Sequence, residues 1–247
     1  AMNFRSHMYT PLHNAAIWIA AWLYGLESYD DTETALIDLG GAPSLDMFTA
    51  LRRHASPLLD DNPTGEPIVR LEFPGPGDAP HLPAGSDAAL AAQHSGALVF
   101  ASPVPNEQIV ITPPLDNPRW FHLADALPSP YIPTPGEADL ELSEAIRRAA
   151  TLIDARGYRS DALANPRLIV GMVGDTYDLS GLPDATPQRT LKLLTRADHI
   201  SAIIEAVISY SGDHSLDAEL LALTRPIRHA RIAAVNYAVA EWGRLKR

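Results

Sequence analysis

Hydrophobic and polar positions change their spacing twice along the chain, and proline marks both changes. Sixteen of the 22 prolines fall between residues 57 and 135, and only four follow residue 135. Proline lacks a backbone donor and fixes φ, so it is excluded from helix interiors and gathers in loops and edge strands. The pattern predicts a helical start, an irregular middle with short strands, and a helical end.

The first part of the chain carries three helical patterns. A helix over residues 10–24 is apolar on several sides, which is typical of a buried helix or of one at an interface. Asp30 followed by Glu33 fits a capping box for a second helix, and Ser44 can cap a third that ends near His54. We expect these helices to form an N-terminal cluster.

The middle of the chain predicts a small, mostly antiparallel sheet. Residues 68–73 alternate with period two, so that Arg70 and Glu72 point to one face and Leu71 to the other. Other strands are expected at 97–101, 109–112 and, more weakly, 119–123, with a short helix over 86–93. The proline-rich loops 74–85 and 102–119 are long enough to be either lids or plain connections.

The last part of the chain predicts an antiparallel helical bundle. Thr134 and Glu137 flank a proline and a glycine, which together form a strong helix start. This helix is expected to reach Gly157, and three more follow with short links. They are expected over 161–177, 186–210 and 215–244, the last bent or interrupted at Pro226. The fold class is therefore α+β, divided at 2–56, 57–135 and 136–247, with a shared core left open.

Composition narrows the function classes. A net charge of −11 disfavours a nucleic-acid backbone or an anionic membrane surface as partner. The absence of cysteine excludes disulfides, thiolate catalysis and cysteine metal sites. The apolar run 15–26 is too short to span a bilayer, and we expect a cytoplasmic protein.

No motif identifies a metal, a cofactor or a reaction. Asp175, Asp178 and Asp184 could bind a hard cation, but solvated carboxylates at a helix end explain them better. The histidines lack the helical spacing of a zinc site, and no Gly-x-Ser-x-Gly elbow is present. We therefore expect no cofactor.

Two basic groups are candidate anion-binding sites. Arg225, Arg228 and His229 make the densest cluster, and Arg196 and His199 lie on one side of another predicted helix. Either group could bind a phosphate or carboxylate. Pairing with carboxylates of this acidic chain is the alternative, and it is favoured for both groups.

Large aromatic side chains are the candidate interface. They lie in the first and last helices, and both core packing and a subunit interface would explain them. The residues are Trp18, Trp22, Tyr24 and Trp242.

Two segments resemble alanine-rich, uncharacterised proteins of actinobacteria. One is Val69-Arg-Leu-Glu-Phe-Pro-Gly-Pro-Gly-Asp78, followed by Leu82-Pro83. The other is Gly171-Met-Val-Gly-Asp-Thr-Tyr-Asp-Leu-Ser-Gly-Leu-Pro183, with Thr186-Pro-Gln-Arg189 and Arg196-Ala-Asp198 after it. The resemblance implies a bacterial protein and brings no activity or catalytic residue.

Two hypotheses for function follow. The first is a non-enzymatic interaction or regulatory protein, expected to be a homodimer that uses the tryptophan-bearing helices. The alternative is an enzyme or binding protein for a small anionic metabolite that uses the Arg/His clusters. Nucleic-acid binding through residues 44–54 is disfavoured by the net charge.

Overall fold

The N-terminal part of the chain folds into four helices. The computed structural model describes residues 3–63, 65–104, 107–124, 127–155, 181–211 and 214–246. The four helices are α1 (Phe4–Met8), α2 (Leu12–Leu23), α3 (Tyr29–Asp38) and α4 (Leu45–Asp60). Helix α2 is buried on nearly all sides, as its continuous apolar pattern predicts. It packs on both the sheet and the longest helix, so it lies at the centre of the molecule.

The sheet is a meander of four antiparallel strands in the order β1-β2-β3-β4. The strands are β1 (Val69–Glu72), β2 (Ala97–Phe100), β3 (Gln108–Thr112) and β4 (Arg119–Leu123), and helix α5 (Asp87–Ser95) precedes β2. All four predicted strands are present. Arg70 pairs with Val99, and Val99 pairs with Val110, which fixes the side-chain rows on each face.

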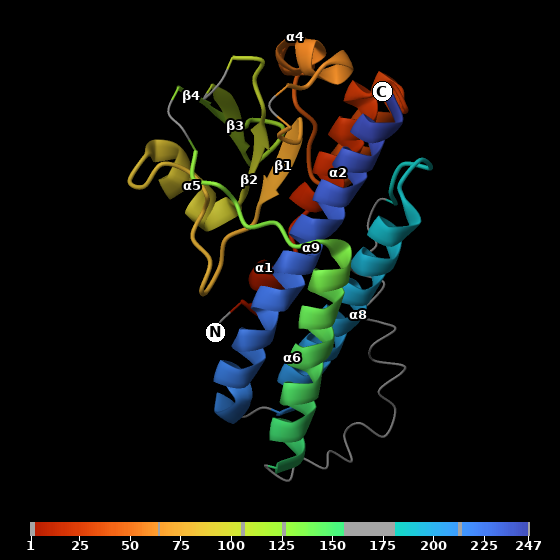
Figure 1. The fold of residues 1–247 in the computed structure, drawn as a ribbon. Coiled ribbons are helices and arrows are strands. Elements are labelled where there is room, and N and C mark those ends of the chain that lie inside the picture. Colours follow the sequence, from red (N-terminus) through yellow and green to blue (C-terminus); the bar gives the residue numbers. More distant parts are fainter. Residues whose placement is uncertain are drawn as a thin grey trace.

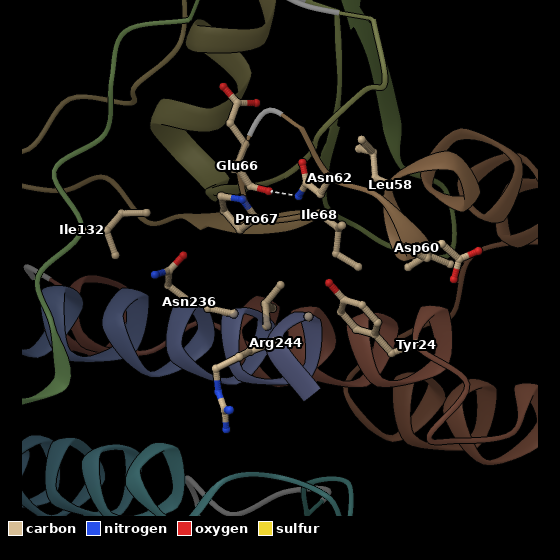
Figure 2. Close-up of a pocket in the computed structure, with 15 residues that line it drawn as sticks. Tyr24, Leu58, Asp60, Asn62, Glu66, Pro67, Ile68, Ile132, Asn236 and Arg244 are labelled. Atoms are coloured by element: carbon tan, nitrogen blue, oxygen red, sulfur yellow. Dashed lines mark hydrogen bonds between the residues drawn. The ribbon is translucent and has the colours of Figure 1, made fainter. Parts of the chain in front are cut away.

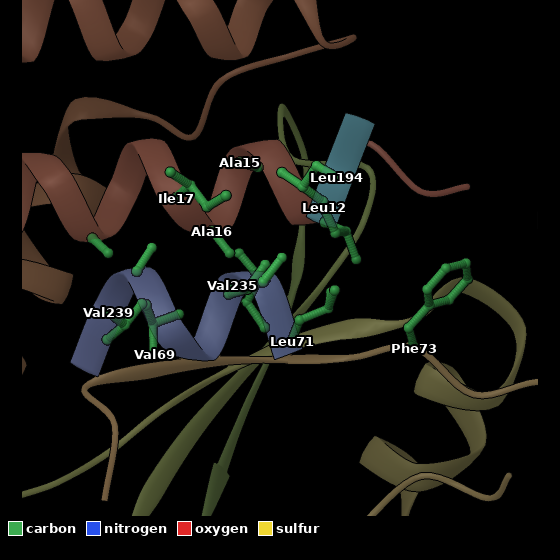
Figure 3. Close-up of a cluster of buried hydrophobic side chains, with 14 of the residues drawn as sticks. Leu12, Ala15, Ala16, Ile17, Val69, Leu71, Phe73, Leu194, Val235 and Val239 are labelled. Carbon is green, nitrogen blue, oxygen red and sulfur yellow. The ribbon is translucent and has the colours of Figure 1, made fainter. Parts of the chain in front are cut away.

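Each face of the sheet packs on a different layer. Leu71, Leu98 and Ile111 belong to the main hydrophobic cluster shared with α2 and the C-terminal helices. Val99 and Val110 face the other way, toward a smaller cluster with α5. Figure 3 shows the first layer, where residues of α2 lie over Val235 and Val239, with Val69 and Leu71 beneath.

The C-terminal part contains α6 (Pro135–Ala155), α8 (Gln188–Ser211), a 3-10 turn η2 (His214–Leu216) and α9 (Asp217–Lys246). Helix α9 packs against α6, α8, α1, α2 and β1, and it runs between the sheet and the other long helices (Figure 1). The predicted α+β class, with N-terminal helices, a small antiparallel sheet and C-terminal helices, is confirmed. One hydrophobic cluster contains residues from all three predicted parts, and the division at 2–56, 57–135 and 136–247 stays a prediction.

Two predicted helix boundaries are wrong. Helix α3 begins after Ser28, whose hydroxyl accepts the Asp31 N–H at 3.0 Å, so Asp30 lies inside the helix rather than at its cap. Helix α4 continues past His54 and contains Pro57, because the residues after His54 still include buried apolar side chains. Of the two alternatives at Pro226, the interruption is excluded because α9 is continuous through this buried residue, and the bend stays a prediction.

Other local predictions are confirmed or fall outside the described residues. Thr134 and Glu137 form the predicted capping box, with Glu137 N–H donating to the Thr134 hydroxyl at 3.2 Å. Ser44 caps α4 as predicted. The predicted helix over 161–177 lies outside the described residues. None of the described helices is both long and apolar enough to cross a membrane.

Gly96 joins α5 to β2 in a conformation that only glycine adopts readily. Its φ is +69° and its ψ is −179°, and an added Cβ would lie 2.8 Å from the carbonyl oxygen of Glu72. We predict that Gly96→Ala lowers the free energy of unfolding by about 3 kcal/mol, through backbone strain and overpacking together. Urea denaturation measures the change.

Gly65 provides the matched control. Its φ is +67°, but an added Cβ there would meet nothing within 4 Å. Gly65→Ala should therefore cost only the backbone strain, about 1 kcal/mol. Equal costs at the two positions would show that the contact with Glu72 is unimportant.

Candidate functional site

The predicted anion-binding cluster is held by a carboxylate of the protein itself. Arg225 Nε lies 3.1 Å from Asp78 Oδ1, and Arg228 Nη2 lies 3.2 Å from Oδ2. His229 Nε2 lies 3.1 Å from the same Oδ2. Asp78 ends the Pro-Gly-Pro-Gly turn after β1, so three basic groups of one α9 segment clamp this loop. We call these four residues the Asp78 clamp.

Arg228 is the buried centre of the Asp78 clamp. Its side chain is fully buried, and it also donates to the Pro76 carbonyl at 2.8 Å and the Thr224 hydroxyl at 2.9 Å. Gly75 lies against the guanidinium so closely that an added Cβ would be 2.5 Å from Arg228 Cζ. The close approach explains why glycine precedes Pro76 in this loop.

His229 links the clamp to α6. Its Nδ1 lies 3.1 Å from Glu141 Oε1, while its Nε2 faces Asp78. Carboxylates only accept, so the imidazolium form can donate to both partners and the neutral form to one. His229 therefore ties α6 to the proline-rich loop through a single side chain.

The other predicted basic group lies elsewhere. Arg196 pairs with Asp139 and donates to the Ser143 hydroxyl at 2.6 Å, which joins α8 to α6. His199 is exposed on α8. The structure thus brings Arg225, Arg228 and His229 together and assigns Arg196 different partners. An anion-binding role for these residues stays a prediction.

The four candidate interface aromatics pack within the chain. Trp22 is 6% exposed and Trp242 is 3% exposed. The Trp242 indole donates to the Ala185 carbonyl at 3.1 Å, and that of half-buried Trp18 donates to the Gly181 carbonyl at 3.3 Å. Tyr24 lines a cavity beside α9. Their contribution to a homodimer stays a prediction.

A second buried network was not predicted. Glu72 on β1 pairs with Arg70 and accepts the His81 backbone N–H at 3.1 Å. His81 Nδ1 lies 3.4 Å from the same carboxylate. Burial would raise the pKa of Glu72, but His81 and Arg70 outweigh it and lower that pKa. The hydrogen bond to Glu72 raises the pKa of His81. Sequence could not place these groups together, since the loop from residue 73 to 81 sets the contact.

A cavity of about 420 Å³, which the sequence does not reveal, lies between α9 and the segment after α4. Its apolar wall includes Ile68, Ile132 and Val239, and its polar side chains include Tyr24 and Asn236. In Figure 2 the Tyr24 hydroxyl and the Asn236 amide point into the space between α9 and residues 62–68. The rim carries charged residues whose side chains turn away from it in the same view, namely Asp60, Glu66 and Arg244.

A metal centre finds no support in the part of the chain described. No group of three or more His, Asp or Glu among those residues could hold a metal ion. Of the acidic run considered for a cation, Asp175 and Asp178 lie outside the described residues, and Asp184 is exposed.

The Asp78 clamp predicts a large cost when its carboxylate is neutralised. Asp78→Asn leaves Arg228 buried without its counter-charge, so we expect the free energy of unfolding to fall by about 2–4 kcal/mol. The matched control is Asp139→Asn, whose pair with Arg196 has side chains 49% and 36% exposed. That change should cost less than about 1 kcal/mol. Chemical denaturation compares the two, and equal costs would contradict the clamp.

The same carboxylate predicts a pH dependence. Burial alone would raise the pKa of Asp78, but His229, Arg225 and Arg228 outweigh it and hold the pKa below its ordinary 3.8. A lowered carboxyl pKa gives stability that is present above the ordinary value and is lost as the pH falls through the folded value. Between about pH 5 and pH 3 the wild type should therefore lose more stability than Asp78→Asn. If the free energies of unfolding of the wild type and of Asp78→Asn fall equally as the pH is lowered, this prediction is contradicted.

Comparisons with known proteins agree with the resemblance found in the sequence. Family models described as "Rv1486c-like protein, N-terminal domain" and "Rv1486c-like protein, C-terminal domain" match residues 13–131 and 136–232. The chain is 28% identical over 281 aligned positions to "Uncharacterized protein MT1533" of Mycobacterium tuberculosis strain CDC 1551, covering 93% of this chain and 97% of that protein. It is 27% identical to "Uncharacterized protein Rv1486c" of strain H37Rv, with the same coverage.

A third relative matches a shorter region. "Uncharacterized protein ML1804" of Mycobacterium leprae is 33% identical over 111 positions, which cover 41% of this chain and 37% of that protein. No solved structure matches the chain at a significant level. The predicted resemblance to uncharacterised actinobacterial proteins is confirmed, since these relatives are mycobacterial. The two family models lie in tandem along most of the sequence, and the chain belongs to the Rv1486c-like family.

Proposed function

We propose that the protein is a non-enzymatic binding protein. Its ligand is a small, uncharged molecule with an amide group and an aliphatic part, and it occupies the cavity between α9 and residues 58–68. The observation that carries the proposal is the position of Asn236, an asparagine in the middle of a helix whose amide faces this cavity (Figure 2).

Asn236 has no structural partner that explains it. It is half-buried, and among the described residues its amide makes no hydrogen bond. Asparagine is less favourable than alanine or leucine in a helix interior, so the position is not explained by local stability. A carboxamide offers both a donor and an acceptor, which is the complement of another amide.

The rest of the cavity fits an uncharged ligand with an aliphatic part. A volume of about 420 Å³ is in the range of small-molecule sites, which are mostly apolar with a few placed polar groups. Ile68, Ile132 and Val239 supply the apolar wall. The rim carries charges of both signs, on Asp60, Glu66 and Arg244, and these side chains turn away from the cavity (Figure 2), so its wall favours an uncharged ligand rather than the anion considered for the Arg/His clusters.

The lining chemistry favours binding over catalysis. Among the described residues, those that line the cavity include no serine, threonine, histidine or lysine. The carboxylate of Asp60 is 87% exposed and lies 3.9 Å from Lys246 Nζ. Nucleophile and general base in hydrogen-bond reach are the usual signature of covalent catalysis. The candidates in this wall are Tyr24, Asp60 and Glu66, and the side chains of Asp60 and Glu66 turn away from the cavity (Figure 2).

An anionic ligand at the Asp78 clamp would need to displace Asp78. The carboxylate is held by Arg225, Arg228 and His229 together. Displacement would break the buried ion pair between Arg228 and Asp78, which would cost several kcal/mol of stability. The clamp therefore supports a structural role better than the anionic-metabolite alternative.

Binding of a defined amide tests the proposal. The probe is N-acetyl-leucinamide, which carries two amides and one isobutyl group. We expect saturable shifts in a ¹⁵N spectrum with a Kd of the order of 1 mM, a value ordinary for a ligand of this size. Asn236→Leu should weaken binding about tenfold, because one well-placed hydrogen-bonding group is lost.

The matched control is Asn117→Leu, which makes the same chemical change at an exposed turn. It should leave the Kd of the probe unchanged. Failure of the wild type to saturate, or equal binding by Asn236→Leu, would contradict the proposed site.

A further inference from the structure

A second, smaller cavity lies on the α5 side of the sheet, beneath the proline-rich connection between β4 and α6. Its volume is about 90 Å³. The lining comes from β1, β2 and β3, from the segment before β1, and from the connection above. The lining residues are Glu66, Pro67, Arg70, Val99, Ala101, Gln108, Leu127, Pro128, Ser129 and Pro130.

Gln108 is a buried amide without a protein partner. Its residue is 4% exposed, and its Oε1 is buried with no hydrogen bond. No contact among the described residues engages its Nε2, which is the end of the amide left to the cavity. Because Nε2 donates, an occupant that accepts from it would gain a hydrogen bond that no described residue supplies.

Arg70 brings further donors to the same face. Strand pairing places Arg70 opposite Val99 and Val99 opposite Val110, and Gln108 is two residues before Val110 on that face. Arg70 is 7% exposed, and its two Nη atoms donate to Glu72 and to the His81 carbonyl. Among the described residues its Nε–H has no acceptor.

The charges around the cavity do not exclude an anion. The Glu72 carboxylate is already paired with Arg70 and lies 3.4 Å from His81 Nδ1. Glu66 is exposed at the rim, where solvent and salt screen its charge. The buried groups at the base of the cavity therefore present donors and no unpaired carboxylate.

The remaining walls are mostly apolar, with Ser129 as a further hydroxyl-bearing residue. Pro67, Pro128 and Pro130 have no backbone N–H, and Val99 and Leu127 are aliphatic. The cavity thus has one end with N–H donors and another of aliphatic and proline groups. An occupant with a charged acceptor at one end and a short alkyl chain at the other matches both.

We propose that this cavity binds a short-chain carboxylate of two to four carbons. Its carboxylate accepts from Gln108 Nε2 and from Arg70, and its alkyl chain packs on Val99, Leu127 and the proline rings. The site is separate from the Asn236 cavity and does not rest on the function proposed above. Water is the competing occupant, since a polar cavity of this size can hold it.

Titration with sodium propionate tests the site at constant ionic strength, with sodium chloride as the reference. We expect saturable shifts of one glutamine side-chain amide in a ¹⁵N spectrum. We also expect a rise in Tm of about 3 °C at ten times Kd. Bicarbonate, which has the acceptors without the alkyl chain, should bind more weakly than propionate.

Gln108→Leu should abolish the response to propionate while keeping the fold, because leucine has similar volume and removes an unsatisfied amide. Gln93→Leu makes the same change at an exposed position of α5 and should respond like the wild type. A nuclear Overhauser contact between propionate and the Gln108 amide in the wild type is the readout that needs no variant. A response no larger than that to chloride, or one that survives in Gln108→Leu, would overturn the proposal and leave water as the occupant.

Discussion

The fold depends on two arginines that α9 buries one turn apart. Arg228 and Arg231 are both fully buried, and a guanidinium in the interior needs hydrogen-bond partners, which Arg228 has on both Nη atoms but not on Nε among the described residues. Arg228 donates to the His7 carbonyl at 3.3 Å, and Arg231 donates to that of Met8, so both satisfy the open C-terminal end of α1. Arg231 also donates to Asp198 at 2.7 Å. Two side chains thus place α1, the loop after β1 and α8 against one helix.

The same constraint explains why a basic cluster need not be a ligand site. Guanidinium groups select carboxylates and phosphates by the same fork geometry, whatever their source. In a chain of net charge −11 an internal carboxylate is available at no cost of association. Asp78 is delivered by a turn whose Gly75 leaves room for the Arg228 side chain. In an acidic chain, an arginine-rich helix therefore indicates contacts with loops of the same chain better than it indicates a ligand site.

Local chemistry made much of the fold predictable and little of the site. The capping box of Thr134 and the alternation around Arg70 are short-range signals, and both elements form as expected. Helix α4 runs past Pro57 because burial of Leu58 outweighs the loss of one backbone hydrogen bond, a balance set by tertiary packing. Asn236 and Gln108 carry no sequence signal at all, since an isolated amide means nothing until its neighbours are known.

The two cavities share a wall, and this bears on how the protein could respond to a ligand. Glu66 and Pro67 line both, and the connection between β4 and α6 contributes Pro130 to one and Ile132 to the other. The Asn62 amide donates to the Glu66 carbonyl at 2.6 Å, which ties the wall to the end of α4. Pro67 has no N–H and a fixed φ, so the wall has little freedom to deform on one side alone. A ligand in one cavity would therefore contact a segment that also lines the other, and the two sites would be coupled if this segment had two arrangements that the ligands bind unequally.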